Sequence, residues 1–245
     1  MGRIAIVSAM HEELRALLPL LEDARTERRA GRACHLGRLD GHDVLLVLCG
    51  IGTVAAATTT AVLLDGMQVQ SLLFTGVAGG LGADVRRGDV VIAQTLLQHD
   101  MDASPLFPRY QVPLTGRSHF AADARMADAL ARGCQAVLQA PHPALARLGI
   151  DAPRCHAGLV ISGDRFVATA AESAVLRAAL PDALAVEMEG AAVAQVCADF
   201  ERPFAVLRTV SDRADDAARL DFDRFIEEVA AEFSRDIVRG TLAHL

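Results

Sequence analysis

The sequence contains no tryptophan, no lysine and a single tyrosine, and its 31 acidic residues outnumber its 24 arginines. The arginines are dispersed and the formal net charge is −7, so no basic patch is present that could follow a phosphate backbone. We therefore expect no nucleic acid among the partners. Without lysine, none of the glycine-rich segments can be a P-loop, which requires Gly-Lys-Ser/Thr.

Cysteine pairs and metal-binding histidine pairs are also missing. The five cysteines lie far apart without a Cys-x-x-Cys pair, which is typical of small buried side chains in a reducing compartment. The histidines form no HxxxH or HExxH pair, and for His99 beside Asp100 and Asp102 a hydrogen-bonded loop is the better explanation. We expect neither a metal nor a cofactor. Strand-like sequence begins at Arg3 with no signal peptide before it, so we expect a cytoplasmic protein.

A long uncharged run occurs at residues 44–64 and matches the length of a membrane span. The sequence GIG at 50–52 interrupts this run, with β-forming residues before it and alanines and threonines at helix-like spacing after it. The pattern predicts a strand, a glycine turn and a buried helix. We therefore expect no membrane association.

Strand-like and helix-like segments alternate along the chain. Strands are predicted at residues 3–9, 33–39, 43–49, 70–75, 89–94, 157–162, 183–187 and 204–210. Helices are predicted at residues 12–22, 53–65, 121–137, 171–180, 189–200 and 222–239. Apolar strands separated by helices indicate an α/β fold, with a mixed, largely parallel twisted sheet covered by helices on both faces.

The connections refine this prediction. Strands 33–39 and 43–49 are joined by Asp-Gly-His and are expected to form a hairpin. The proline-containing segment 97–120 is expected to be an ordered functional loop, because it lies between strong elements. No linker, internal repeat or low-complexity tract divides the chain, so residues 1–245 are predicted to form a single domain.

Ligands of such sheets bind beyond the carboxyl ends of the strands. The sequence places glycines and carboxylates there, in the clusters 9–13, 50–52, 75–80, 162–164, 187–189 and 211–212. The glycines of TGVAGG at 75–80 would let a ligand oxygen approach backbone N–H groups. A plain tight turn explains this segment equally well.

Glu187 and Glu189 lie where a strand leads into a helix, and in extended backbone both would point to the same face. The two oxygens of a carboxylate can accept hydrogen bonds from both hydroxyls of a cis-diol, so ribose is a suitable ligand, foremost for Glu189. Glu187 could instead accept N–H groups at the start of helix 189–200. Met188 between them would be assigned to the core on spacing alone.

Asp212 ends the apolar run 204–212. Burial would raise the pKa of its carboxyl and let it protonate a leaving group, although a helix N-cap is an equal alternative. Arg208 in the same run is expected to pair with carboxylates, because an unpaired buried guanidinium is very costly. Glu12 and Glu13 open the first helix, and interaction with the helix dipole is enough to explain one of them. The same location would keep a carboxylate ionised, so that it could deprotonate a water. One protonated and one ionised carboxyl is the arrangement that glycosidic hydrolysis uses.

Taken in order, these clusters resemble the methylthioadenosine/S-adenosylhomocysteine nucleosidases of the purine nucleoside phosphorylase and nucleosidase superfamily. The resemblance rests on AMHEEL (9–14), GIG (50–52), TGVAGGL (75–81), GDVV (88–91), HDMD (99–102), GLVISGDRFV (158–167), VEMEGAAVAQVC (186–197) and RTVSD (208–212). It covers nearly the whole chain and implies a hydrolase that releases adenine from a 5′-modified adenosine.

The resemblance also implies catalytic roles. Asp212 would be the general acid at adenine N7, and Glu13 would position the attacking water. The remaining implied substrate-binding residues are Glu189 at the ribose hydroxyls, Met188 beside the sugar, Phe166 stacked on adenine, Val167 through its backbone, Ser211 and Arg208 in support, and Ile51 and Phe222 around the 5′ substituent. Glu187 and Val77 complete the predicted substrate-binding set.

Family members are homodimers in which the segment matching 99–107 completes the neighbouring site. The resemblance therefore implies a homodimer in which Ala103, Leu106 and Phe107 act in trans. Two departures leave the 5′ group open: Val77 stands where many members have serine, and the loop 104–116 differs from that of the best-known enzymes.

Three alternatives remain. The same hydrolysis on a 5′-deoxyadenosine or aminofutalosine type of substrate fits the two departures. A phosphorylase would need a cationic pocket, whereas Glu13 would lie beside the phosphate. A non-catalytic nucleoside-binding protein would have no need of a matched acid and base.

Overall fold

The computed structural model describes residues 2–245. Its strands are β1 (Arg3–Ser8), β2 (Glu22–Arg29), β3 (Arg32–Leu39), β4 (His42–Leu48), β5 (Val69–Gly80), β6 (Val90–Gln98), β7 (His119–Ala121), β8 (Cys155–Ser162), β9 (Ala183–Glu187) and β10 (Phe204–Asp212). Its helices are α1 (His11–Leu14), α2 (Thr53–Gly66), α3 (Ala124–Leu138), α4 (Pro143–Arg147), α5 (Ala170–Ala179), α6 (Gly190–Asp199), α7 (Ala218–Phe225) and α8 (Ala231–Leu242). Two further turns are the 3₁₀ turn η1 (Leu18–Leu20) and the π-helical turn η2 (Ile226–Ala230).

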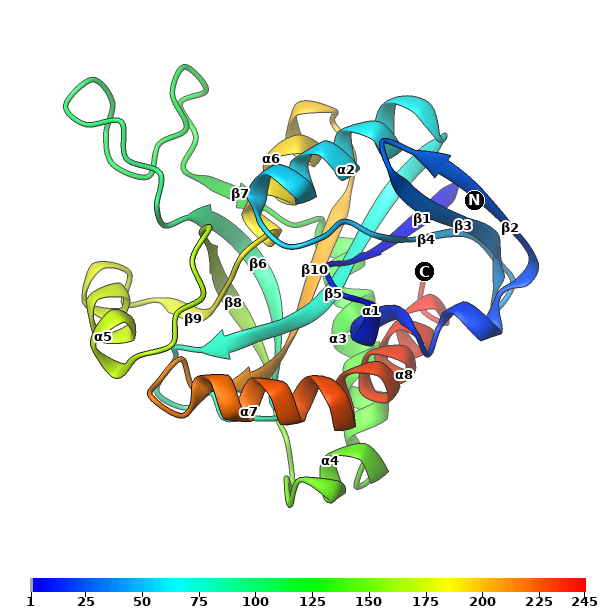
Figure 1. Cartoon of the computed structure of the whole chain (residues 1–245). Helices are drawn as coiled ribbons and strands as arrows, with labels where there is room; N and C mark the ends of the chain where they lie inside the picture. The colour runs from blue at the N-terminus through cyan, green and yellow to red at the C-terminus, as the bar shows by residue number, and fades with distance from the viewer. Residues whose placement is uncertain (1) are drawn as a thin grey trace.

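The strands form one mixed sheet in the order β10-β6-β8-β9-β5-β1-β4-β3-β2, with β7 beside β6. Strand β10 pairs with both β5 and β6, so the strands β10, β6, β8, β9 and β5 close into a ring (Figure 1). At one point of this ring the ends of β5 and β9 pair antiparallel, with Gly79 opposite Val186. This pairing brings the ends of β5, β9 and β10 together.

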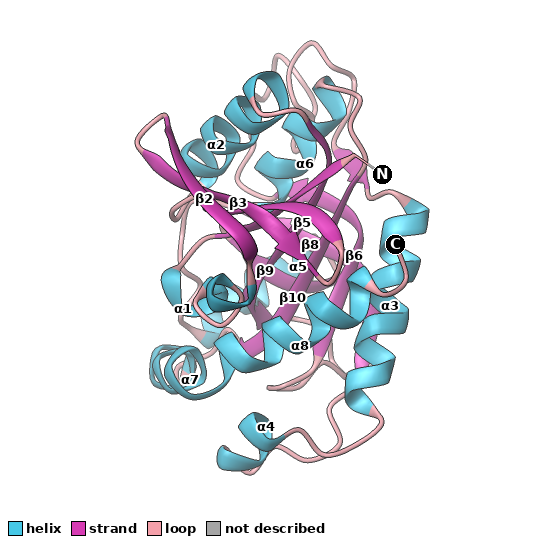
Figure 2. Cartoon of the chain, turned by 90° about the vertical axis from the view of Figure 1, so that its right-hand side faces the viewer, coloured by secondary structure: helices cyan, strands magenta, loops and turns pink. Residues whose placement is uncertain are grey.

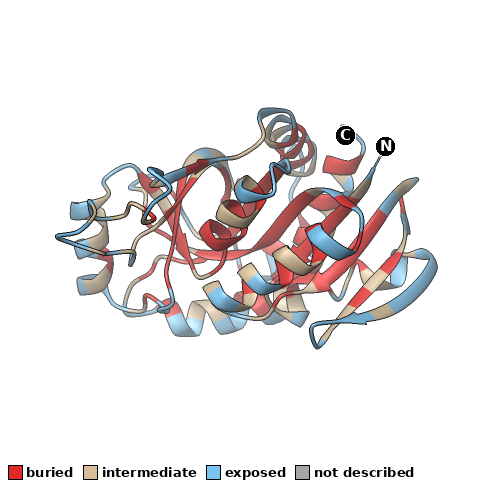
Figure 3. Ribbon diagram, turned by 90° about the horizontal axis from the view of Figure 1, so that it is seen from above, coloured by how far each residue is buried: buried red, intermediate tan, exposed pale blue. Residues whose placement is uncertain are grey.

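Helices cover both faces of the sheet. Leu72 and Phe74 of β5 pack into a core with α2 and α6, whereas Leu73 points to the opposite core with α3 and α8. Figure 2 shows α3 and α8 lying across one face, and Figure 3 shows the buried residues concentrated along the strands. The predicted mixed α/β fold is confirmed, since alternate residues of these apolar strands meet helices on either side.

Several local predictions are confirmed. Strands β3 and β4 pair antiparallel around Asp40 and Gly41, as expected for the hairpin. The run 44–64 is divided between β4 and α2, with the turn GIG between them. Within residues 2–245, no helix is long and apolar enough to cross a membrane.

The predicted helix at 12–22 was wrong. Helix α1 ends at Leu14 and Pro19 lies in the separate turn η1, because proline inside a helix loses a hydrogen bond and clashes with the preceding turn. Strand β2 then begins at Glu22 and was not predicted. Most of its residues are charged and exposed, so it lacks the apolar alternation of a typical strand. Charged side chains are common on edge strands, and β2 lies at the edge of the sheet.

The segment 99–118 contains no helix or strand and extends away from the body of the molecule beyond β6 and β7 (Figure 1). The predicted helix 222–239 instead starts at Ala218 and is interrupted by η2, so that α7 and α8 are separate helices. Strand β7 and helix α4 were not predicted, because both are too short to show a period.

We expect Gly133→Ala to lower the free energy of unfolding by about 1–3 kcal/mol, the usual cost of overpacking. A Cβ at Gly133 in α3 would lie 2.5 Å from the backbone nitrogen of Thr241 in α8, so the two helices would have to separate. Urea denaturation measures the effect. The matched control is Gly66→Ala at the end of α2, where an added Cβ meets nothing within 4 Å. Equal losses in both variants would contradict the close contact.

Candidate active site

A cavity of about 490 Å³ lies beyond the ends of β1, β4, β5, β9 and β10 and beside α7. The predicted residues that line it are Glu13, Ile51, Val77, Phe166, Glu187, Met188, Glu189, Ser211, Asp212 and Phe222. Its other lining residues are Ala9, Met10, Ala78, Gly79, Val186, Arg219 and Asp223. The cavity therefore lies at the strand ends where the sequence analysis placed the ligand.

Glu13 is buried at the start of α1 and accepts three backbone hydrogen bonds. Its Oε2 accepts from Ala9 at 3.0 Å and Met10 at 2.9 Å, and its Oε1 accepts from Val77 at 3.0 Å. Burial raises the pKa of the Glu13 carboxyl, while the Arg208 charge and these three N–H donors oppose the rise. All three donors favour the ionised form, because a backbone N–H can donate to a carboxylate but cannot accept a hydrogen bond from a protonated carboxyl.

Arg208 and Glu187 form a buried ion pair, which confirms the pairing expected for Arg208. The guanidinium donates to Glu187 Oε2 from Nη2 at 2.6 Å and from Nε at 3.1 Å, and its carbon lies 4.0 Å from the centre of the Phe74 ring. Arg208 is 1% exposed and does not line the cavity. It therefore acts on the site through its charge and through Glu187.

Glu187 also holds the start of α6. Its carboxylate accepts from the backbone nitrogens of Gly190 at 2.8 Å and Glu189 at 3.2 Å, and from the hydroxyl of Ser162. This confirms that Glu187 accepts N–H groups at a helix N-terminus. Although Glu187 borders the cavity, its two oxygens are already engaged by protein donors.

Glu189 accepts fewer hydrogen bonds than Glu187. Its Oε1 accepts from the backbone nitrogen of Gly52 at 2.9 Å, and among residues 2–245 no donor is bonded to its Oε2. Burial, followed by the Glu187 charge, raises the pKa of Glu189 to about 8. Asp164 was not predicted as a site residue. It holds the turn that contains Gly52, since it accepts a hydrogen bond from Thr53 N at 2.7 Å.

Asp212 lies at the end of β10 and is 1% exposed. Its Oδ1 accepts from Ala214 N at 2.8 Å and its Oδ2 accepts from the Ser211 hydroxyl at 2.8 Å. Burial raises the pKa of the Asp212 carboxyl, and the charges of Asp215 and Asp221 raise it further. The hydrogen bonds from Ala214 and Ser211 oppose this rise, but the pKa is raised overall, which favours the protonated form. The helix N-cap alternative was wrong, because α7 begins only at Ala218.

Two glycines of the segment 75–80 make room for these carboxyls. In the register of β5 and β10, Gly76 lies opposite Arg208 and Gly79 lies opposite Asp212. A Cβ at Gly76 would lie 2.8 Å from Glu13 Oε1, and one at Gly79 would lie 3.1 Å from Asp212 Oδ1. The sequence analysis predicted that a ligand oxygen would approach these glycines. In the structure, carboxyl groups of the protein itself, from Glu13 and Asp212, approach them closely.

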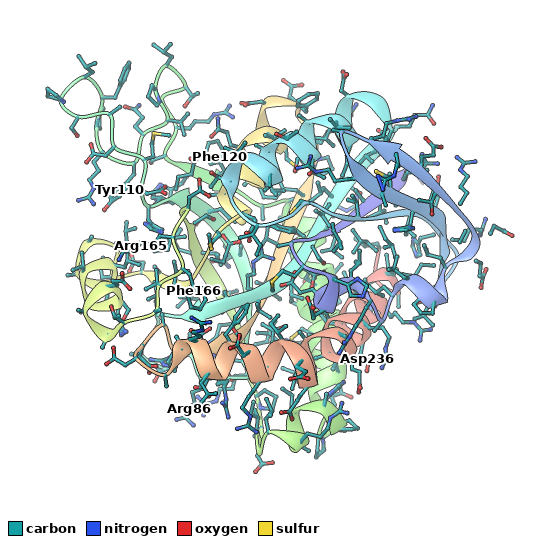
Figure 4. The ribbon with its side chains drawn as sticks, viewed as in Figure 1. Arg86, Tyr110, Phe120, Arg165, Phe166 and Asp236 are labelled. Atoms are coloured by element: carbon teal, nitrogen blue, oxygen red, sulfur yellow. The ribbon has the colours of Figure 1, made fainter. Side chains whose placement is uncertain are left out.

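Apolar side chains form the opposite wall. Phe166, labelled in Figure 4, lies beside α7 and its ring contacts that of Phe222 edge to face, with 5.5 Å between the ring centres. Ile51 and Met188 complete the apolar lining named in the sequence analysis.

Five predicted residues lie outside this cavity, among them Arg208, whose buried position is described above. Val167 is buried in a cluster with Leu81 and Ile161 and does not line it. Ala103, Leu106 and Phe107 belong to the extended segment 99–118, and Leu106 is 83% exposed. Conversely, Arg219 and Asp223 line the cavity without having been predicted. Their spacing with Phe222 on one helix face could have indicated them.

The site therefore combines four buried carboxyls with one buried guanidinium. Like charges this close cannot all ionise at neutral pH, so part of the set must keep its protons. Arg208 lies beside Glu187 and near Glu13, whereas Asp212 accepts hydrogen bonds from the neutral donors Ala214 N and the Ser211 hydroxyl. Such a set provides a proton donor and a proton acceptor in one cavity.

Comparison with known proteins places this geometry in a family. Residues 3–243 match the model of the phosphorylase superfamily. The chain is 35% identical over 244 residues to the 5′-methylthioadenosine/S-adenosylhomocysteine nucleosidase of Hydrogenovibrio crunogenus, which covers 99% of each chain.

Solved structures are similar to a comparable extent. The Colwellia psychrerythraea methylthioadenosine/S-adenosylhomocysteine nucleosidase in complex with adenine superposes with a TM-score of 0.90 and 34% identity, over 100% of this chain and 96% of that one. Futalosine hydrolase of Helicobacter pylori gives a TM-score of 0.84 and 30% identity, over 99% and 98% of the chains. The chain belongs to the phosphorylase superfamily and, within it, to the family of the methylthioadenosine/S-adenosylhomocysteine nucleosidases.

Proposed function

We propose that this protein hydrolyses the N-glycosidic bond of 5′-methylthioadenosine and S-adenosylhomocysteine, releasing adenine and the 5-substituted ribose. The observation that carries the proposal is the placement of Asp212 and Glu13 in one cavity with different partners: Glu13 accepts three backbone N–H groups, whereas Asp212 accepts one backbone N–H and the Ser211 hydroxyl. The nucleosidase relatives support the choice of substrates.

In the proposed reaction, protonated Asp212 gives its proton to adenine N7 while the bond between N9 and C1′ breaks. The ribose passes through an oxocarbenium-like state, in which positive charge develops near the buried carboxylates. Ionised Glu13 orients a water toward C1′ and accepts its proton as the new C–O bond forms. Water thus supplies the hydroxyl of the sugar product: one of its protons stays on that hydroxyl and the other passes to Glu13, while adenine leaves with the proton from Asp212.

The remaining side chains position the nucleoside. Glu189 accepts hydrogen bonds from the ribose hydroxyls through its unengaged Oε2, and Met188 packs beside the sugar. Phe166 stacks on adenine. The backbone of the next residue, Val167, binds the edge of the base, while the Val167 side chain packs in a separate cluster. The adjacent Ser211 hydroxyl orients the Asp212 carboxyl.

Other residues act at the periphery of the site. Arg208 is a positioning residue that pairs with Glu187, and its charge opposes the rise that burial causes in the pKa of Glu13. Ile51 and Phe222 line the space for the 5′ substituent, and Val77 lies near the sugar. Hydrolysis of an aminofutalosine-type substrate is the second candidate, supported by the similarity to futalosine hydrolase and by Val77 in place of serine.

We also propose that the chain folds as a single domain and acts as a cytoplasmic homodimer in methionine salvage. Several large apolar side chains are exposed around the cavity and on the segment 99–118, namely Ile51 (58%), Val54 (76%), Leu106 (83%) and Leu114 (91%). Exposed apolar groups on one side of a molecule are typical of an association surface. In the dimer, Ala103, Leu106 and Phe107 would complete the neighbouring site.

We expect the wild-type protein to release adenine from both nucleosides in phosphate-free buffer, measured by chromatography. A phosphorylase would need added phosphate, and a non-catalytic binding protein would retain intact nucleoside. Asp212→Asn should lower kcat/KM about 10²–10⁴-fold, because it removes the general acid. Asp199→Asn makes the same change at an exposed position at the end of α6 and should leave the rate unchanged. Similar rates for both variants would overturn the role of Asp212.

The raised pKa of Asp212 also predicts a dependence of stability on pH. The folded state binds this proton more tightly than the unfolded state, so its ionisation destabilises the wild type as pH rises above about 4 toward the folded pKa. Asp212→Asn carries no such charge, so its stability relative to the wild type should increase through this window. Urea denaturation across the pH range measures the difference. If the stability of Asp212→Asn minus that of the wild type stayed constant or fell as pH rises, Asp212 would be ionised in the folded protein throughout this range. Asp199→Asn again provides the control.

A further inference from the structure

Two charged side chains on the side of α7 that borders the cavity have no partner among residues 2–245. Arg219 and Asp223 are one helical turn apart, and both line the cavity together with Phe222. Within residues 2–245, neither side chain makes an ion pair or a hydrogen bond. Their neighbours on the same helix are paired, since Asp221 contacts Arg87 and Arg224 lies 3.6 Å from Glu228.

Arg219 and Asp223 line a cavity whose other ionisable groups are all acidic. The deeper lining carries only acidic ionisable groups, from Glu13, Glu187, Glu189 and Asp212, and Arg219 is the single cation among the described lining residues. A substrate carboxylate in this cavity would be repelled by its acidic groups unless it lay beside Arg219. A positive group would in turn be attracted to Asp223.

We propose that Arg219 and Asp223 bind the two charged ends of an amino acid attached to the 5′ position. Arg219 pairs with the α-carboxylate and Asp223 pairs with the α-ammonium group. The inference rests on the proposed function and deepens it, because of the two proposed substrates only S-adenosylhomocysteine carries such a tail. Methylthioadenosine ends in an uncharged methylthio group that can contact Phe222 and Ile51 alone.

The geometry of the helix suits a zwitterion. Residues four apart on a helix present neighbouring side chains, so one cation and one anion lie side by side. Both side chains are exposed at the mouth of the cavity, where each new ion pair contributes about two- to fivefold in affinity because water screens it. The pair therefore tunes the preference between substrates and leaves the chemistry at C1′ to the buried carboxyls.

The test compares kcat/KM for S-adenosylhomocysteine with that for methylthioadenosine in each variant. We expect Arg219→Gln and Asp223→Asn each to lower the ratio of the two values about two- to fivefold. Arg224→Gln removes the same charge from the same helix at a position outside the cavity lining, and should leave the ratio unchanged. A ratio that is unchanged in the Arg219 and Asp223 variants, or that falls equally in Arg224→Gln, would overturn the proposal.

Substrate analogues separate the two contacts. With an S-adenosylhomocysteine analogue that lacks the carboxylate, Arg219→Gln should have no effect on the ratio while Asp223→Asn still lowers it. An analogue that lacks the amino group should show the reverse. Added salt should lower the ratio in the wild type but not in the double variant, because it screens exposed charges. The opposite pattern in either analogue would exclude this pairing.

Failure of the proposed function would look different. In that case the wild type would release no adenine from either nucleoside. Calorimetric binding of the two nucleosides to the wild type, Arg219→Gln and Arg224→Gln would then decide the inference by itself. Stronger binding of S-adenosylhomocysteine that depends on Arg219 would support it, and equal binding in all three proteins would refute it.

Discussion

The buried guanidinium of Arg208 determines how the rest of the site is charged. It lies against Glu187 and close to Glu13, and it is shielded from water by the strands around it and by the Phe74 ring. Because a buried cation stabilises nearby carboxylates, the Arg208 charge opposes the rise that burial causes in the pKa of Glu13. Asp212 lies four residues further along the same strand, where burial raises the pKa of its carboxyl. The Arg208–Glu187 ion pair therefore lies closer in its effect to the proposed base than to the proposed acid.

The closed part of the sheet makes this separation possible. Strand β10 carries Arg208 and Asp212, and its pairing with β5 places a glycine opposite each of them. The backbone of β5 then donates to Glu13, and the pairing of β9 with β5 brings Glu187 and Glu189 to the same cavity. Burying so many carboxyls costs stability, which the apolar cores on both faces of the sheet offset. Catalytic groups held in this way have little freedom to move, and such preorganisation is what electrostatic catalysis requires.

Much of this arrangement could be predicted from the sequence, because it depends on strand ends. The apolar strands, the hairpin of β3 and β4 and the position of the cavity follow from periodicity and from the rule for ligands of α/β sheets. Strand β2 could not be predicted, since its charged residues show no apolar face, and Pro19 ended a helix that the apolar pattern favoured. Gly76 and Gly79 make room for the carboxyls because they lie opposite Arg208 and Asp212 in the β5–β10 pair. The register of two strands distant in the chain cannot be deduced from the sequence. Arg219 and Asp223 resemble an ordinary solvated helix face until the cavity beside α7 is known.

The protonation states of Asp212 and Glu13 are the most direct test of this mechanism. Carbon-13 NMR of labelled aspartate and glutamate carboxyl groups can observe both, with the signals assigned from Asp212→Asn and Glu13→Gln. Near neutral pH we expect the Asp212 carbon at the position of a protonated acid and the Glu13 carbon at that of a carboxylate. Two ionised groups, or the reverse order, would contradict the assignment of acid and base.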